Sequence, residues 1–192
     1  MPAKAPVSTT VRRNIIRLDL LAPVVFNVSN TLFNTGFVFP ALVSYERQLS
    51  GQWSLGAEAL VNGGDRTDRR SGAGLMARYY TKKADPAVGL MTGFYCSPVV
   101  SYRALASTWL LDGNLFTRGK RLGAGLMIGY QFPLGRPSTS RVALDVSTGL
   151  LNWSRIGTDR SEVDPAQPNS SGPALNKTGP SPDFRLGVGF RL

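Results

Sequence analysis

The chain has 192 residues, of which 42% are hydrophobic and 18% are charged. This length suits one domain with a full core, and the composition is typical neither of a disordered chain nor of a helical membrane protein. The absence of histidine excludes Ser-His and Cys-His nucleophilic catalysis and removes nearly every zinc site. Cys96 is the only cysteine, which excludes an internal disulfide and a multi-cysteine metal site.

Lysine and arginine, 22 residues together, outnumber the 12 acidic residues and give a net charge of +10. Such a balance can indicate nucleic acid or an anionic membrane surface as a partner. The basic residues are spread along the chain, and no aromatic-basic cluster resembles an RNA-binding signature. We therefore expect no nucleic-acid partner.

The N-terminal region carries neither a membrane-spanning helix nor a secretory signal. The longest apolar stretch, residues 20–26, contains Pro23 and is far shorter than the roughly 20 residues that a spanning helix needs. The first residues, 1–6, lack the apolar core of a signal peptide. For an exported protein we would expect a trimmed leader or a misassigned start. We expect residues 1–14 to form a flexible segment ahead of one domain over residues 15–192.

The first half of the chain contains four segments in which apolar residues alternate with small or polar ones. They run over residues 15–26, 37–49, 53–62 and 72–81. In the first segment, Ile16, Leu18 and Leu20 share one face, and Arg17 and Asp19 share the other. This period of two predicts β-strands.

The second half contains four more such segments, over residues 91–105, 121–132, 142–150 and 184–190. In the clearest one, Leu126, Ile128 and Tyr130 alternate with Gly125 and Gly129. One face of every segment is a continuous apolar row, and the other consists of glycine, serine, arginine and acidic residues. A glycine-rich polar row weakens an exposed strand but suits the crowded inside of a narrow barrel. We therefore expect an all-β fold, an eight-stranded antiparallel up-and-down transmembrane β-barrel with the apolar row outside.

The connections between these segments support the same topology. Longer connections, residues 27–36, 63–71, 106–120 and 154–183, alternate with shorter ones, residues 50–52, 82–90 and 133–139. Outer-membrane barrels have longer outer loops and shorter periplasmic turns. The stretch over residues 154–183 is rich in Pro, Ser, Asn and Gly and is predicted to be a long mobile loop.

Aromatic residues collect at the two ends of the predicted strands, on the apolar face. Bilayer-spanning barrels carry two aromatic girdles of this kind, whereas aromatics in a soluble core need not sort to strand ends. The predicted membrane girdles contain Phe26, Phe37, Phe39, Tyr45, Trp53, Tyr79, Tyr102, Tyr130, Phe132, Phe184 and Phe190.

Charged residues on the other face form the candidate site of the protein. They are Arg17, Asp19, Glu46, Glu58, Arg78, Arg103, Arg121, Arg141, Asp145, Arg185 and Arg191. We interpret them as an internal salt-bridge network, because buried charges are normally paired and eight strands leave room only for side chains. The excess of arginine also allows a small polar pore or an anion site.

Acidic and basic residues outside the predicted strands are candidates for separate sites. Two acidic groups, Asp65 with Asp68 and Asp159 with Glu162 and Asp164, lack a recognisable calcium spacing, so we expect solvated loop charge and no metal or cofactor. The tip over residues 65–70 could contact lipopolysaccharide phosphates through Arg66, Arg69 and Arg70.

Several short stretches resemble small Gram-negative outer-membrane barrels. They are VSYERQLS at 43–50, WSLG at 53–56, GFY at 93–95, VSYR at 100–103, GAGLMIGYQ at 123–131 and FRLGVGFR at 184–191. The chain is most similar to the uncharacterised group known as domain of unknown function 3575. The resemblance covers most of the chain from Ile15 and implies a fold and a location in the cell envelope, because that group has no assigned activity.

These observations predict a non-enzymatic barrel of the bacterial outer membrane, a structural or surface-binding module that acts through its long extracellular loops. Its expected partners are outer-membrane lipid and lipopolysaccharide, with a surface ligand or protein that the sequence does not name. One alternative is a soluble lipocalin-like carrier of a small ligand, which would turn Leu126, Ile128 and Leu144 inward. The other is an outer-membrane enzyme acting on lipid, which would gather carboxylates near one rim.

Overall fold

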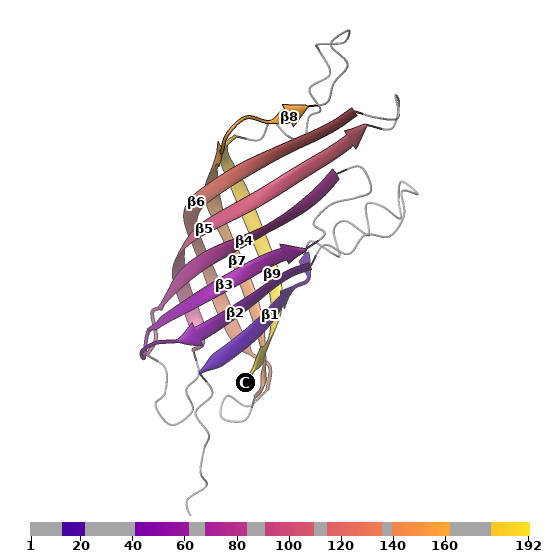
Figure 1. Ribbon diagram of the computed structural model, residues 1–192. Helices are drawn as coiled ribbons and strands as arrows, with labels where there is room; N and C mark the ends of the chain where they lie inside the picture. Colours follow the sequence, from indigo (N-terminus) through magenta and orange to yellow (C-terminus); the bar gives the residue numbers. More distant parts are fainter. Residues whose placement is uncertain are drawn as a thin grey trace, which may run out of the picture.

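A computed structural model describes residues 13–21, 41–61, 68–83, 91–109, 115–135, 140–161 and 178–192 (Figure 1). These residues build a closed, antiparallel, up-and-down β-barrel of eight strands, as the alternation predicts. The strands are β1 (Asn14–Asp19), β2 (Ala41–Gln48), β3 (Trp53–Val61), β4 (Asp68–Tyr80), β5 (Gly93–Trp109), β6 (Leu115–Pro133), β7 (Val142–Arg155) and β9 (Gly179–Arg191). A two-residue strand, β8 (Arg160–Ser161), pairs with the outer part of β6 and lies beyond the barrel wall.

The barrel closes because the last strand pairs with the first. In β9, Phe190 lies opposite Ile16 of β1, and the same strand also pairs with β7. The backbone N–H of Leu192 donates to the carbonyl of Asn14 at 3.0 Å, so β1 begins and β9 ends at the same end of the barrel (Figure 1). We call this the turn end, since the tight β2–β3 hairpin, closed by the Leu49 N–H to the Trp53 carbonyl at 2.9 Å, lies there too. The opposite end is the loop end.

The phase of the alternation is confirmed on every long strand. On β3, each second residue from Ser54 to Glu58 is buried, and the residues between them are exposed. Large apolar side chains point outward: Leu75 is 63% exposed, Leu126 is 53% and Leu150 is 62%. The barrel is therefore apolar outside and mostly polar inside.

Close packing explains the glycines of the inner row. A Cβ atom on Gly123 would lie 2.7 Å from the indole ring of Trp153 on the neighbouring strand, so only glycine leaves room for that ring. Trp153 packs against an apolar layer that crosses the middle of the barrel, made of Met76, Val99, Met127 and Leu151. Side chains, not a channel, fill the interior at this level.

Some strands are longer than the alternation predicts. Residues 106–120 are for the most part not a loop, because β5 and β6 stay paired out to Trp109 opposite Leu115. Similarly, β7 reaches Arg155 and β9 begins at Gly179, so the loop predicted over residues 154–183 is too long at both ends. Backbone hydrogen bonds continue here although apolar and polar residues no longer alternate in the sequence. The first strand ends at Asp19 rather than at residue 26, and residues 22–40 lie outside the described residues.

Candidate functional site: the charged interior of the barrel

Four charged side chains from four strands meet inside the turn half of the barrel; we call them the turn-side cluster. Arg17 Nη1 lies 2.5 Å from Glu46 Oε2, and Arg78 Nη1 lies 2.6 Å from Asp145 Oδ2. Longer contacts of 3.4 Å join Arg17 to Asp145 and Arg78 to Glu46, which closes a ring. No side chain of the ring is more than 6% exposed. Two cations and two anions therefore balance each other where water is excluded.

Hydroxyl and amide groups complete this cluster. The Tyr95 hydroxyl donates to Asp145 at 2.7 Å, and the Tyr80 hydroxyl donates to Glu46 at 3.0 Å. The guanidinium of Arg78 also lies 4.2 Å above the centre of the Tyr95 ring. Gln131 accepts from Arg17 and donates to the Met91 carbonyl. Such hydrogen bonds offset the cost of removing the four charges from water.

A second group, the loop-side cluster, lies beyond the apolar layer. The carboxylate of Glu58 has no exposed surface and accepts from Arg185, from Arg103 at 3.2 Å and from Ser101 at 3.3 Å. Arg185 also pairs with Asp183 at 2.8 Å. The interior thus stacks an ionic layer, an apolar layer and a second ionic layer along the barrel axis.

A third group of charged residues joins the barrel wall to the segment after β7. Arg121 donates two hydrogen bonds to Asp159, at 2.8 and 3.0 Å, and Arg155 lies 3.3 Å from the same carboxylate. These hydrogen bonds from Arg121 hold the pKa of Asp159 below its usual value. Asp159, which the sequence predicts to be a solvated loop charge, is therefore an ion-pair partner of Arg121 and Arg155.

The structure places ten of the eleven predicted interior charges inside the barrel wall. Eight are buried (Arg17, Asp19, Glu46, Glu58, Arg78, Arg121, Asp145 and Arg191), and Arg103 and Arg185 are half-buried. The prediction for Arg141 is wrong: it is exposed, because it precedes the first residue of β7, and its carbonyl accepts from the Arg191 N–H. Asp19 accepts from the backbone N–H groups of Leu21 and Leu186.

Sequence reasoning missed the uncharged members of the network. Tyr80 and Tyr95 each lie beside an outward aromatic residue, Tyr79 and Phe94, so strict alternation places them inside. Neither residue carries a charge or belongs to the predicted girdles, so the charged residues of the inner face do not point to them. Gln131 follows the outward Tyr130, so alternation places it on the inner face as well, but nothing local indicates its partners.

Aromatic residues of the predicted girdles lie on the outer wall where the structure describes them. Seven are exposed: Tyr45, Trp53, Tyr79, Tyr130, Phe132, Phe184 and Phe190. Tyr102 is half-buried, and Phe26, Phe37 and Phe39 lie outside the described residues. Near the turn end the ring centres of Trp53 and Tyr79 are 5.0 Å apart, and those of Tyr130 and Phe132 are 4.4 Å apart.

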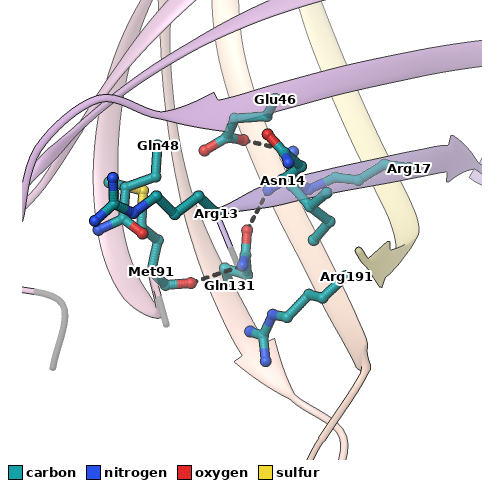
Figure 2. Close-up of a pocket in the computed structure, with 9 residues that line it drawn as sticks. Arg13, Asn14, Arg17, Glu46, Gln48, Met91, Gln131 and Arg191 are labelled. Atoms are coloured by element: carbon teal, nitrogen blue, oxygen red, sulfur yellow. Dashed lines mark hydrogen bonds and ion pairs between the residues drawn. The ribbon is translucent and has the colours of Figure 1, made fainter. Parts of the chain in front are cut away.

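A small pocket opens at the turn end, next to the turn-side cluster. It encloses about 260 Å³ of space, part of it open to solvent. Its lining includes Arg13, Arg17, Glu46, Gln48, Gln131 and Arg191, and Figure 2 shows Gln131 at its centre, bonded to Met91. Arg17 and Glu46 are already paired with each other, and Arg191 donates to the Ser140 carbonyl at 3.3 Å. No residue of the apolar layer lines the pocket, so it ends within the turn half.

Comparison with protein-family models, with curated proteins and with solved structures found no match. No helix in the described ranges is long and apolar enough to cross a membrane. Any function must therefore be inferred from the barrel itself.

Proposed function

We propose that this chain is an integral β-barrel of the bacterial outer membrane, and that it serves as a non-enzymatic structural or surface-binding module through its long loops. The observation that carries the proposal is the inverted polarity of the barrel. Soluble barrels keep their apolar row inside, whereas this one turns that row outward and buries its charges.

The outer apolar row supports insertion into a bilayer because it is continuous from strand to strand. Leu75 lies opposite Val100, and Leu126 lies opposite Leu150, all of them more than half exposed. Monomeric soluble proteins rarely expose apolar patches larger than a few hundred Å². Lipid would cover this band, and the aromatic residues near its edge would lie at the membrane–water interface.

The paired interior supports a structural role rather than a pore or an enzyme. The two ionic clusters and the apolar layer between them occupy the lumen at successive levels. Glu46, Glu58 and Asp145 each accept from an arginine, which leaves these three carboxylates poorly suited to general acid–base work. The chain has no histidine to take that role. We also propose that the chain belongs to the group known as domain of unknown function 3575, on the strength of the short sequence stretches that resemble it.

Two observations on the described residues favour this proposal over the two alternatives. A lipocalin-like carrier would enclose Leu126 and Ile128, but these are 53% and 44% exposed. A lipid-modifying enzyme would gather carboxylates near one rim. Instead Asp159, the carboxylate described beyond the end of β7, is engaged by Arg121 and Arg155.

The experiment that tests the proposal compares the purified chain with and without detergent. Circular dichroism measures β-structure, and a gel of boiled and unboiled samples measures heat-modifiability. We expect β-structure and a mobility shift on boiling only when detergent or lipid is present. A monomer that is folded in plain buffer would overturn the membrane assignment.

A further inference from the structure

Three arginines on adjacent strands lie in one row toward the loop end of the barrel. Arg103 on β5 lies opposite Arg121 on β6, and Arg121 lies opposite Arg155 on β7. Like charges directly opposite each other destabilise a sheet, so each needs an anion close by. Glu58 supplies a carboxylate to Arg103 at 3.2 Å. The anion that serves both Arg121 and Arg155 is Asp159.

A bulge in the segment after β7 brings Asp159 to this position. The pairing of β6 with β7 extends to Arg121, and its pairing with β8 begins at Arg118, so two residues of β6 lie between the two pairings. On the facing segment four residues, 156–159, fill the same interval. The facing segment therefore carries two extra residues. Bulges re-aim a side chain where a ladder is interrupted, and this one directs Asp159 toward Arg121.

Glycines and the backbone fit this bulge. The Ile156 N–H donates to the Lys120 carbonyl at 3.0 Å, so the ladder continues into the first residue of the bulge. Gly157 has a φ of 71°, in the left-handed region that glycine adopts without strain. Gly119 on β6 leaves room for the carboxylate, because a Cβ atom there would lie 2.6 Å from Asp159 Oδ1. Both strands of this ladder are therefore shaped around the Asp159 side chain.

The two arginines hold the Asp159 carboxylate as a site would hold a bound oxyanion. Arg121 donates from Nη1 to Oδ1 at 2.8 Å and from Nη2 to Oδ2 at 3.0 Å, and Arg155 Nε lies 3.3 Å from Oδ2. The side chain of Arg121 is 2% exposed, whereas that of Asp159 is 16% exposed. Paired donation by one guanidinium is the geometry that recognises planar oxyanions. The cation is thus buried in the wall, and the anion reaches it from the bulge.

We propose that Arg121 and Arg155 form an oxyanion site, that Asp159 occupies it as a tethered carboxylate ligand, and that this contact is a latch that holds residues 156–161 against β6. The backbone pairing of β8 covers only two residues, so the segment depends on the latch to stay paired. This inference goes beyond the proposed function and holds whether or not lipid surrounds the barrel.

The test measures hydrogen exchange at the Ile156 amide by NMR, in the full chain folded in detergent micelles. Asp159→Ala removes the tethered carboxylate. The matched control, Asp183→Ala, removes another carboxylate from the loop half of the barrel, one that pairs with Arg185 at 2.8 Å. Gly119→Ala keeps every charge but obstructs the approach of Asp159, and it therefore tests the latch without changing the charge balance.

We expect exchange at Ile156 to be at least about 10-fold faster in Asp159→Ala and in Gly119→Ala than in the wild type, and unchanged in Asp183→Ala. Sodium formate should restore slow exchange in Asp159→Ala, because free carboxylate then occupies the site, whereas sodium chloride at the same concentration should not. Adding Arg155→Gln to Asp159→Ala should abolish the rescue by formate.

Wild-type exchange at Ile156 in both latch variants would overturn the proposal. Equal acceleration in Asp183→Ala would also overturn it, because the loss of any negative charge from this half of the barrel would then explain the effect. Rescue by chloride as strong as that by formate, or no rescue by formate, would refute the oxyanion site. None of these outcomes bears on the membrane assignment, which the comparison with and without detergent tests separately.

Discussion

Arg78 on β4 reaches Asp145 on β7 with an Nη1–Oδ2 distance of 2.6 Å, although these strands are not neighbours in the barrel wall. The pair crosses the lumen and joins two parts of the wall that share no backbone hydrogen bonds. Because the same residues also contact Glu46 and Arg17, removing one member leaves an odd charge in a site without water.

Replacing one charged member of this ring should destabilise the folded barrel. Asp145→Asn is expected to lower the free energy of unfolding by about 3 kcal/mol or more, since it leaves the buried Arg17 and Arg78 with only the Glu46 carboxylate between them. Urea unfolding in detergent micelles measures the loss. The double variant Arg78→Met/Asp145→Asn should lose less unfolding free energy than the two single variants lose when their losses are added. Strict additivity would show that the two side chains do not act as a pair.

The inner glycine row should be intolerant of even one methyl group. Gly123→Ala would place its Cβ 2.7 Å from the Trp153 ring and is expected to cost about 1–3 kcal/mol of unfolding free energy. Gly51→Ala, in a turn with no atom within 4 Å of the added Cβ, serves as the control and should be nearly neutral. Urea unfolding of both variants measures the difference. Equal stability of the two would contradict the packing described here.

A charged substitution in the outer row should destabilise the barrel only where lipid covers that row. Leu126→Arg is expected to destabilise the barrel in lipid vesicles by about 2–4 kcal/mol. Leu49→Arg makes the same change at a leucine that is 63% exposed in the β2–β3 hairpin and should have little effect. Unfolding by denaturant from vesicles compares them. If Leu126→Arg leaves the stability in vesicles unchanged, this wall faces water.

The Arg121–Asp159 contact should depend on pH in one direction. The pKa of Asp159 is lowered, so its carboxylate stabilises the contact at and above the ordinary aspartate pKa near 3.8. That stabilisation is lost as the pH falls through the lower folded-state pKa. An NMR titration should find the midpoint for Asp159 below 3.8, and Arg121→Gln should move it upward. A midpoint unchanged by Arg121→Gln would argue against the contact.

The sequence predicts the wall of this barrel well because alternation is a local property. The period of two alone correctly places Leu126 on the outer face and Asp145 on the inner face. The extension of β5 and β6 to Trp109 and Leu115 was missed, because strand pairing needs only backbone groups and leaves no mark in the side-chain pattern. The exposed position of Arg141 depends on where a strand starts, which periodicity defines least sharply.

Partners within the interior could not be predicted in the same way. Alternation places Arg78, Asp145 and Glu58 on the inner face. Which of these charges form pairs depends on the curvature of the closed wall and on side chains from distant strands. Asp159 illustrates the limit, since its contact with Arg121 spans 38 positions and passes through a turn. Composition indicated that the charges would pair, and only the closed barrel shows how.

Quenching of a fluorophore at position 126 tests the central claim most directly. Cys96→Ala removes the native thiol, after which Leu126→Cys and Leu49→Cys are labelled separately and the chain is reconstituted into vesicles. If the wall faces lipid, brominated lipid quenches the label at 126 and a water-soluble quencher does not, with the opposite result at 49. A label at 126 that the water-soluble quencher reaches as readily as the label at 49 would contradict the membrane-spanning assignment.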